Sequence, residues 1–260
     1  MFMALFNAIL YKPIFNAFVV LYNIIPGHDV GIVILVITII IRLVLYPLTN
    51  SSIKAQKSMQ ELQPKMDALK KEFGSDQQRL AQETMKLYKE HKVNPLTSCL
   101  PILIQLPILI ALYLVLRDGL AGQNLAANLY PFVHNPEVIK QMSLGFFDLA
   151  KPSIALAVLA GAAQFWQAKM MIRKPSPPAA GAGGKDENMM AMMNKQMLYL
   201  MPAMTVIIGM KLQAGLTLYW FFSTALMVAQ QMILFSRQKN KALAVSVVSD
   251  VPATALEIKK

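Results

Sequence analysis

The stretch VGIVILVITIIIRLVLYPL, residues 30–48, decides the fold class of this chain. Its only polar interruptions are Thr38, Arg42 and Tyr46. A helix needs about 20 mainly apolar residues to cross the hydrocarbon core of a bilayer, so this stretch predicts a transmembrane helix. The composition agrees, because 55% of the 260 residues are hydrophobic and 15% are charged, against about 25% charged in soluble domains. We therefore expect a membrane protein.

Four further apolar stretches follow along the chain. They cover residues 100–116, about 154–171, 197–210 and 216–235. The stretch 197–210 makes a helix of roughly 21 Å at 1.5 Å per residue, which is shorter than a hydrocarbon core of about 30 Å. The bilayer should therefore thin beside it. Together the five stretches predict an all-α polytopic membrane protein with five transmembrane helices.

The N-terminal segment, residues 1–27, is apolar but lacks the basic start and the small-residue cleavage site of a signal peptide. Lys12, Asn16 and Asn23 fall on one narrow stripe of a helix. This pattern favours a helix lying in the membrane interface, and a sixth span is the alternative. The remaining expected segments are a first transmembrane helix over 28–50, a cytoplasmic helical hairpin over 51–94, transmembrane helices two to five over 95–237 with a flexible linker at 174–185, and a disordered cytoplasmic tail over 238–260.

The hairpin between the first two spans is predicted from apolar residues that recur every three or four positions on two charged helices. These residues are Met59, Leu62, Met66, Leu69, Phe73, Leu80 and Leu87. Ser75 and Gln78 have the spacing of a capping box that would open the second helix. Pro64 is expected to kink or restart the first helix.

The basic residues predict the orientation of the chain in the membrane. With five spans, the side that holds the hairpin, the loop 169–195 and the tail carries 19 Lys+Arg, and the opposite side carries 5. Cytoplasmic loops carry the excess of Lys and Arg. We therefore expect a multi-pass membrane protein with its N-terminus outside and its C-terminus in the cytoplasm.

Arg42 is the residue most suggestive of function, because a central Arg costs about 2.5–3.5 kcal/mol on insertion scales. No acidic residue lies inside the five spans to pair with it. One interpretation is a side chain that extends to the inner interface. The other is a water-filled cavity, open to the cytoplasm, to which other spans contribute polar side chains. The candidates for that cavity are Gln105, Gln164, Gln167 and Thr224. Each glutamine could instead hold two helices together.

The same residues argue against several classes of protein. Cys99 is the only cysteine, and the three histidines are far apart in the sequence, so we expect no metal site. The sequence contains no Gly-rich phosphate-binding motif and no recognisable nucleophile with a base, so we expect no cofactor and no enzyme. The net charge of +11 comes from basic residues beside apolar runs, which favours membrane topology over direct nucleic-acid binding.

Several motifs occur in order along the chain. They are Arg42 followed by YPLT (46–49), LQPKM (62–66), LYKEHKVNPL (87–96), PILIQLPILIALY (101–113), FWQAKM (165–170) and GLTLYW (215–220). Together they resemble the YidC/Oxa/Alb family of membrane protein insertases, in its bacterial short form without a large periplasmic domain, over roughly residues 10–237. The resemblance implies a protein of the bacterial plasma membrane with five spans, a cytoplasmic hairpin and a hydrophilic groove closed toward the outside. It also implies groove positions at Arg42, Gln167, Tyr219 and Trp220. Thr224 stands where the family commonly has Asn.

The resemblance predicts a membrane protein insertase that accepts hydrophobic segments of nascent membrane proteins and releases them into the lipid bilayer. The ribosome, the signal recognition particle receptor and the Sec translocon are candidate partners. Two other functions are consistent with an unpaired Arg42. One is a transporter or channel for a small anion, and the other is a passive scaffold for membrane assembly.

Overall fold

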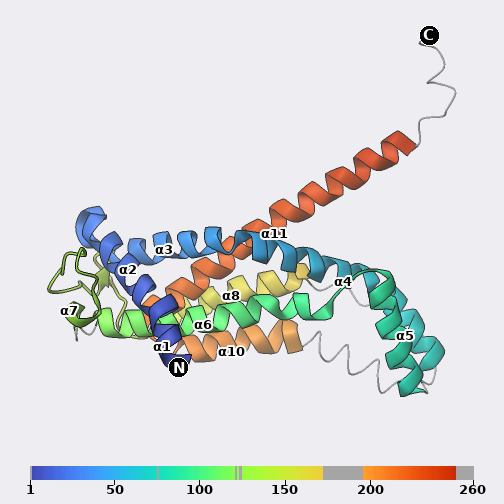
Figure 1. Cartoon of the computed structure of the whole chain (residues 1–260), viewed down its shortest axis with the longest axis horizontal. Coiled ribbons are helices and arrows are strands. Elements are labelled where there is room, and N and C mark those ends of the chain that lie inside the picture. The colour runs from blue at the N-terminus through green and yellow to red at the C-terminus, as the bar shows by residue number, and fades with distance from the viewer. Residues whose placement is uncertain (1, 75, 121, 123–124, 172–195, 250–260) are drawn as a thin grey trace, which may run out of the picture.

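The computed structural model describes residues 2–74, 76–120, 122, 125–171 and 196–249, and these residues are mostly helical. Long helices lie along one another in a bundle, with α7 and the loop after it at one end and α5 at the other (Figure 1). Of the short elements, η1 and η3 are π-helical and η2 is a 3-10 turn. The elements are α1 Phe2–Phe6, η1 Asn7–Tyr11, α2 Lys12–Ile24, η2 Pro26–His28, α3 Val30–Val44, α4 Tyr46–Phe73, α5 Gln77–Glu90, α6 Pro95–Leu120, α7 Leu125–Asn128, β1 Met142–Ser143, β2 Phe147–Asp148, α8 Ile154–Met171, η3 Gln196–Leu200, α10 Met201–Gly209 and α11 Ala214–Ser249.

The bundle is held together mainly by α11, which packs against α3 and α8, while α8 also packs against α10. Small residues let α8 and α10 approach closely. A Cβ added at Gly161 would overlap the side chain of Val206, and one added at Gly209 would lie 3.0 Å from Ala157 Cβ. Small residues at helix contacts are typical of bundles in membranes, where no hydrophobic effect drives the helices together.

The all-α polytopic class is confirmed, and the count of five spans stays a prediction. Among the described residues, three helices are long and apolar enough to cross a membrane, at Met3–Ile24, Leu103–Leu120 and Ala214–Ser236. The helices α3 and α4 together form a fourth candidate, bent by 69°. The region Gln196–Gly209 is a shorter apolar helix, as the sequence predicts. Helix α8 begins and ends where the third span was expected.

The first span is shorter than its apolar run. The sequence predicts a helix through residue 48, but α3 ends at Val44 and α4 begins at Tyr46. Pro47 explains the break, because it has no N–H to donate to the carbonyl of Leu43 four residues earlier. The boundary expected between residues 50 and 51 therefore falls inside α4. The chain changes direction at Leu45, three residues after Arg42.

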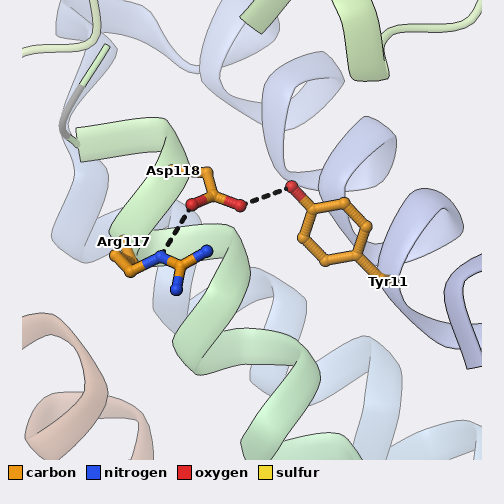
Figure 2. Close-up of polar contacts among 3 residues, drawn as sticks. All are labelled: Tyr11, Arg117 and Asp118. Atoms are coloured by element: carbon orange, nitrogen blue, oxygen red, sulfur yellow. Dashed lines mark hydrogen bonds and ion pairs between the residues drawn. The ribbon is translucent and has the colours of Figure 1, made fainter. Parts of the chain in front are cut away.

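The N-terminal helices α1, η1 and α2 run steeply across the bundle near its α7 end (Figure 1). Figure 2 shows the contact that holds them to α6, in which Tyr11 Oη donates to Asp118 Oδ2 at 2.7 Å and Arg117 Nε donates to Asp118 Oδ1 at 2.8 Å. Asn16, expected on a polar stripe, is buried and donates to the backbone oxygen of Asn128. The polar stripe therefore serves partly to bind the 125–134 segment. The interfacial placement of residues 1–27 stays a prediction.

The helical hairpin consists of α4 and α5, which pack against each other. Leu62 and Met66 are buried, and the other apolar residues of the predicted stripe are half-buried. Pro64 was expected to kink or restart the first helix. The helix does not restart there, because α4 is one helix from Tyr46 to Phe73, and a kink at Pro64 stays a prediction. The exposed side of α4 carries Pro64, so its ring displaces no packed neighbour.

In two further segments the structure differs from the prediction. Asp76, rather than Ser75, is the N-cap of α5, because its Oδ1 accepts from Arg79 N at 3.0 Å; Ser75 lies outside the described residues. The tail expected to be disordered from residue 238 is helical as far as Ser249, since Ala, Leu and Lys there are good helix formers. The expected linker 174–185 and residues 250–260 lie outside the described residues.

The loop between α7 and α8 contains a small antiparallel hairpin that the sequence analysis did not predict. Strand β1 pairs with β2, with Met142 opposite Asp148 and Ser143 opposite Phe147. Gly145 has a φ of 79°, which a residue without a Cβ adopts at no steric cost. The loop is joined to the bundle where Ala214 N donates to the backbone oxygen of Lys151 at 2.9 Å.

Candidate functional site

Arg42, on the last turn of α3, points to α11 and donates two hydrogen bonds to one hydroxyl. Its Nε lies 3.1 Å and its Nη2 2.5 Å from Ser223 Oγ. Side chains on a helix point toward its N-terminus, and here that direction leads away from the α3–α4 bend. Ser223 is nine residues into α11, or roughly 14 Å along it. The guanidinium therefore points from α3 to α11, which favours a polar site between these helices, and the water-filled cavity stays a prediction.

Two more of the predicted site residues join this cluster. Gln105 Nε2, on α6, donates to Tyr219 Oη at 2.7 Å. Tyr219 is one turn before Ser223 on α11 and is almost fully buried. Three helices thus bring together a cation, a phenol, a hydroxyl and an amide.

The cation in this cluster has no anionic partner in the described part of the chain. The ion pairs there involve other residues, and none includes Arg42. A buried charge is costly unless paired or solvated. Of its five N–H donors, Ser223 takes two, which leaves three for water or for an anionic ligand.

A cavity of about 220 Å³ lies beside Arg42 between α3, α4 and α11. Leu43 and Ile233 on its wall are 66% and 52% exposed, so the cavity opens sideways through an apolar rim. Gln230 contributes a polar group and donates to Thr49 Oγ1 at 3.2 Å. Its lining residues are Ile39, Arg42, Leu43, Tyr46, Leu226, Ala229, Gln230 and Ile233.

The other predicted groove residues form no hydrogen bond with Arg42 in the described part of the chain. Gln164 accepts a hydrogen bond from Thr205 Oγ1 at 2.7 Å, which joins α8 to α10. Gln167 donates to the sulfur of Met227, which joins α8 to α11. These two contacts match the alternative in which the glutamines hold helices together. Thr224 is buried and Trp220 is half-buried, both on α11.

Ser223, Tyr46 and Gln230 belong to the site but were not predicted from the sequence. The signal for Ser223 was present, because it is four residues after Tyr219 and therefore on the same helix face. Gln231 adds a further polar group inside the bundle. It is fully buried, and its amide has no partner among the described residues. Buried amides are normally satisfied, which is consistent with a hydrated interior.

Among the described residues, no group of three His, Cys, Asp or Glu side chains could hold a metal ion. The arrangement around Arg42 can attract and bind an anionic group. Fold and site together define a polytopic helical membrane protein with a cationic polar site inside the bundle, open sideways through an apolar rim.

Comparison with known proteins identifies the family. The model of the 60Kd inner membrane protein family matches residues 20–241, so the chain belongs to this family. It is 37% identical over 207 residues to the membrane protein insertase YidC of Fusobacterium nucleatum, covering 80% of this chain and 86% of that protein. It is 36% identical over 215 residues to the membrane protein insertase MisCA of Bacillus subtilis, covering 80% of this chain and 71% of that protein.

Other relatives are longer than this chain. At 32% identity over 232 residues, the match to YidC of Histophilus somni covers 89% of this chain but only 38% of that protein. A crystal structure of an active YidC insertase has the same fold with a TM-score of 0.54 and 24% sequence identity, over 86% of this chain and 46% of that one. The shared region is therefore the membrane bundle described above.

Proposed function

We propose that this chain is a membrane protein insertase, which accepts hydrophobic segments of nascent membrane proteins at the Arg42 site and releases them into lipid. The observation that carries the proposal is the geometry of Arg42. Its charge is unpaired in the described chain, is fixed by Ser223, and faces a cavity with an apolar rim. Such a site can hold a charged flank on one side while an apolar segment contacts lipid on the other.

The proposed mechanism has two steps. The acidic flank of an incoming segment is attracted by Arg42, whose free N–H groups can bind a carboxylate. The apolar segment then leaves past Ile39, Leu43 and Ile233, since transfer to lipid yields about 25 cal/mol per Å² of apolar surface. Neither step needs a nucleotide or a covalent intermediate, so we propose that the protein is not an enzyme.

The protein is a multi-pass inner membrane protein, and we propose that the α5 end of the bundle is cytoplasmic. The excess of Lys and Arg on the hairpin side supports this orientation. The hairpin would then meet nascent chains together with the ribosome, the signal recognition particle receptor or the Sec translocon. The opposite end, with α7 and the β1–β2 hairpin, would face outward.

A small-anion transporter is the second candidate, because an unpaired, half-buried Arg42 could equally bind a small anion. Purified protein in proteoliposomes separates the candidates. An insertase makes an added membrane protein substrate resistant to external protease, whereas a transporter gives anion flux without such protection. A passive scaffold gives neither, and that result would contradict the proposed function.

A further inference from the structure

Asp29, at the outer end of α3, accepts four hydrogen bonds. Two come from its own helix, from Gly31 N at 2.8 Å and Ile32 N at 3.2 Å, and make Asp29 the N-cap of α3. The other two come from the β1–β2 hairpin more than 100 residues later, from Ser143 Oγ and Leu144 N, both at 2.6 Å. One carboxylate therefore caps α3 and fixes the β1–β2 hairpin to it.

The same hairpin is also attached to α11. Gly215 N donates to the backbone oxygen of Leu149 at 3.0 Å, and the side chain of Leu149 is almost fully buried. The hairpin thus lies over the outer ends of α3 and α11. These are the two helices that carry Arg42 and Ser223, so the hairpin lies at the outer end of the helices that form the polar site.

A second cavity of about 220 Å³ lies between the hairpin and the bundle. Leu218 and Phe222 line it, and they immediately precede Tyr219 and Ser223 of the polar site on α11. The cavity therefore borders the same two turns of α11 that carry Tyr219 and Ser223. The wall is mainly apolar, and apolar constrictions close a path by excluding water. Its lining residues are Gly31, Ile32, Leu35, Ser143, Leu144, Phe147, Leu149, Leu156, Leu218 and Phe222.

We propose that the β1–β2 hairpin is a lid over an outer exit, that Asp29 is its latch, and that the lid opens to let the polar flank of a substrate leave the Arg42 site outward. This inference rests on the proposed function. A flank held at Arg42 has to cross the remaining outer half of the membrane, and the cavity lies in that direction. The latch consists of two hydrogen bonds from the hairpin, so it can open without unfolding the bundle.

A reversible disulfide cross-link between α3 and the β1–β2 hairpin tests whether the lid must open. A Cβ built at Gly31 lies 3.1 Å from Ser143 Cβ, slightly less than the roughly 3.5–4.5 Å of a disulfide. Gly31→Cys with Ser143→Cys, in a Cys99→Ser background, should therefore form a disulfide after a small shift. In proteoliposomes we expect oxidation to reduce insertion of a substrate with a translocated acidic flank at least tenfold, and reduction to restore it. The two single variants, oxidised in the same way, are the controls.

Equal insertion by the cross-linked and the reduced protein would overturn the lid. If the Cys99→Ser parent inserts no substrate, the proposed function itself fails, and a labelling experiment still tests the latch. That experiment uses Leu218→Cys under the lid, with and without Asp29→Asn. Asn keeps the helix cap, but it replaces one of the two carboxylate oxygens that bind the hairpin with an N–H donor.

In the labelling experiment an impermeant thiol reagent is added from outside to vesicles. We expect Leu218→Cys to react at least tenfold faster when Asp29 is replaced by Asn, while Met85→Cys on α5 stays unlabelled. Equal labelling rates of Leu218→Cys with and without Asp29→Asn would overturn the role of Asp29 as the latch. Labelling of Met85→Cys in the same vesicles would mean that the orientation proposed for the chain is wrong.

Discussion

At the scale of single residues, the ability of the site to bind a ligand depends on which N–H groups of Arg42 already donate hydrogen bonds within the protein. Nε and Nη2 share the hydroxyl of Ser223, so the guanidinium is fixed in direction but keeps donors for a ligand. An anchoring arginine would instead direct its donors to the membrane surface. The arrangement therefore favours binding over anchoring.

The first prediction follows from this difference. Arg42→Ala should lower insertion of substrates with acidic translocated flanks by about tenfold or more, because a hydrogen bond to a charged group contributes about 1.5–3 kcal/mol and 1.4 kcal/mol is a factor of ten. Arg42→Lys should keep most of the activity, since a single charge suffices for attraction. Protease protection of the substrate measures both. Equal losses in the two variants would contradict a simple electrostatic role.

Asp29 gives a prediction about pH. Its burial alone would raise the pKa, but hydrogen bonds from Leu144, Ser143, Ile32 and Gly31 outweigh it and hold the pKa below the ordinary 3.8. A group with a lowered folded-state pKa stabilises the fold above its ordinary pKa and loses that effect as the pH falls through the lower value. We expect the protection factor of the Leu144 amide in hydrogen exchange to be constant from about pH 8 to 5 and to fall below about pH 4.

Two other titratable groups lie near Asp29, and their contribution to the pH dependence has to be separated from that of Asp29. The ring of His28 contacts the backbone oxygen of Tyr22 rather than Asp29. On the hairpin, Asp148 pairs with Lys151 at 2.8 Å, and that hydrogen bond also lowers the pKa of the Asp148 carboxyl. The acid loss of protection should persist in Asp148→Asn and disappear in Asp29→Asn. The opposite result would assign the transition to Asp148.

At the scale of elements, the bounds of a helix could be predicted where an apolar run has clear polar or proline residues at both ends. The run 154–171 has that property, and α8 matches it. Contacts between distant segments were not predictable, because a sequence pattern gives the face of a helix but not its partner. Thr224 was proposed for the groove, whereas its neighbour Ser223 binds Arg42. Asp29 was overlooked, although an Asp directly before an apolar run is a typical N-cap.

The close contact between α8 and α10 gives the third prediction. Gly161→Leu should force these helices apart, since even a Cβ at this position would overlap Val206. Overpacking of this kind typically costs about 1–3 kcal/mol. Thermal denaturation in detergent should show a lower midpoint. Ala163→Leu on the same helix is a size-matched control, since its side chain is only half-buried. Equal midpoints in the two variants would show that the α8–α10 contact is not tight.

At the scale of the whole molecule, the polar site lies between two ends that differ in how they are closed. The α7 end is covered by the β1–β2 hairpin, which is bound to both α3 and α11. Toward the α5 end, α4 bends away from α3 by 69° directly after Arg42. The bend leaves the cavity beside Arg42 with an open side. The difference between the ends predicts that water enters from the α5 end only.

Cysteine labelling tests that asymmetry. Gln105→Cys and Gln230→Cys, each in a Cys99→Ser background, should react with an impermeant thiol reagent added on the cytoplasmic side and not with reagent added outside. Gln230 lines the cavity and Gln105 bonds to Tyr219 in the polar cluster, so water should reach both. Gln164→Cys, whose amide is bonded to Thr205 between α8 and α10, should react much more slowly. Labelling from outside would indicate a channel, and no labelling of Gln230→Cys from either side would indicate a dry bundle in which Arg42 has only a structural role.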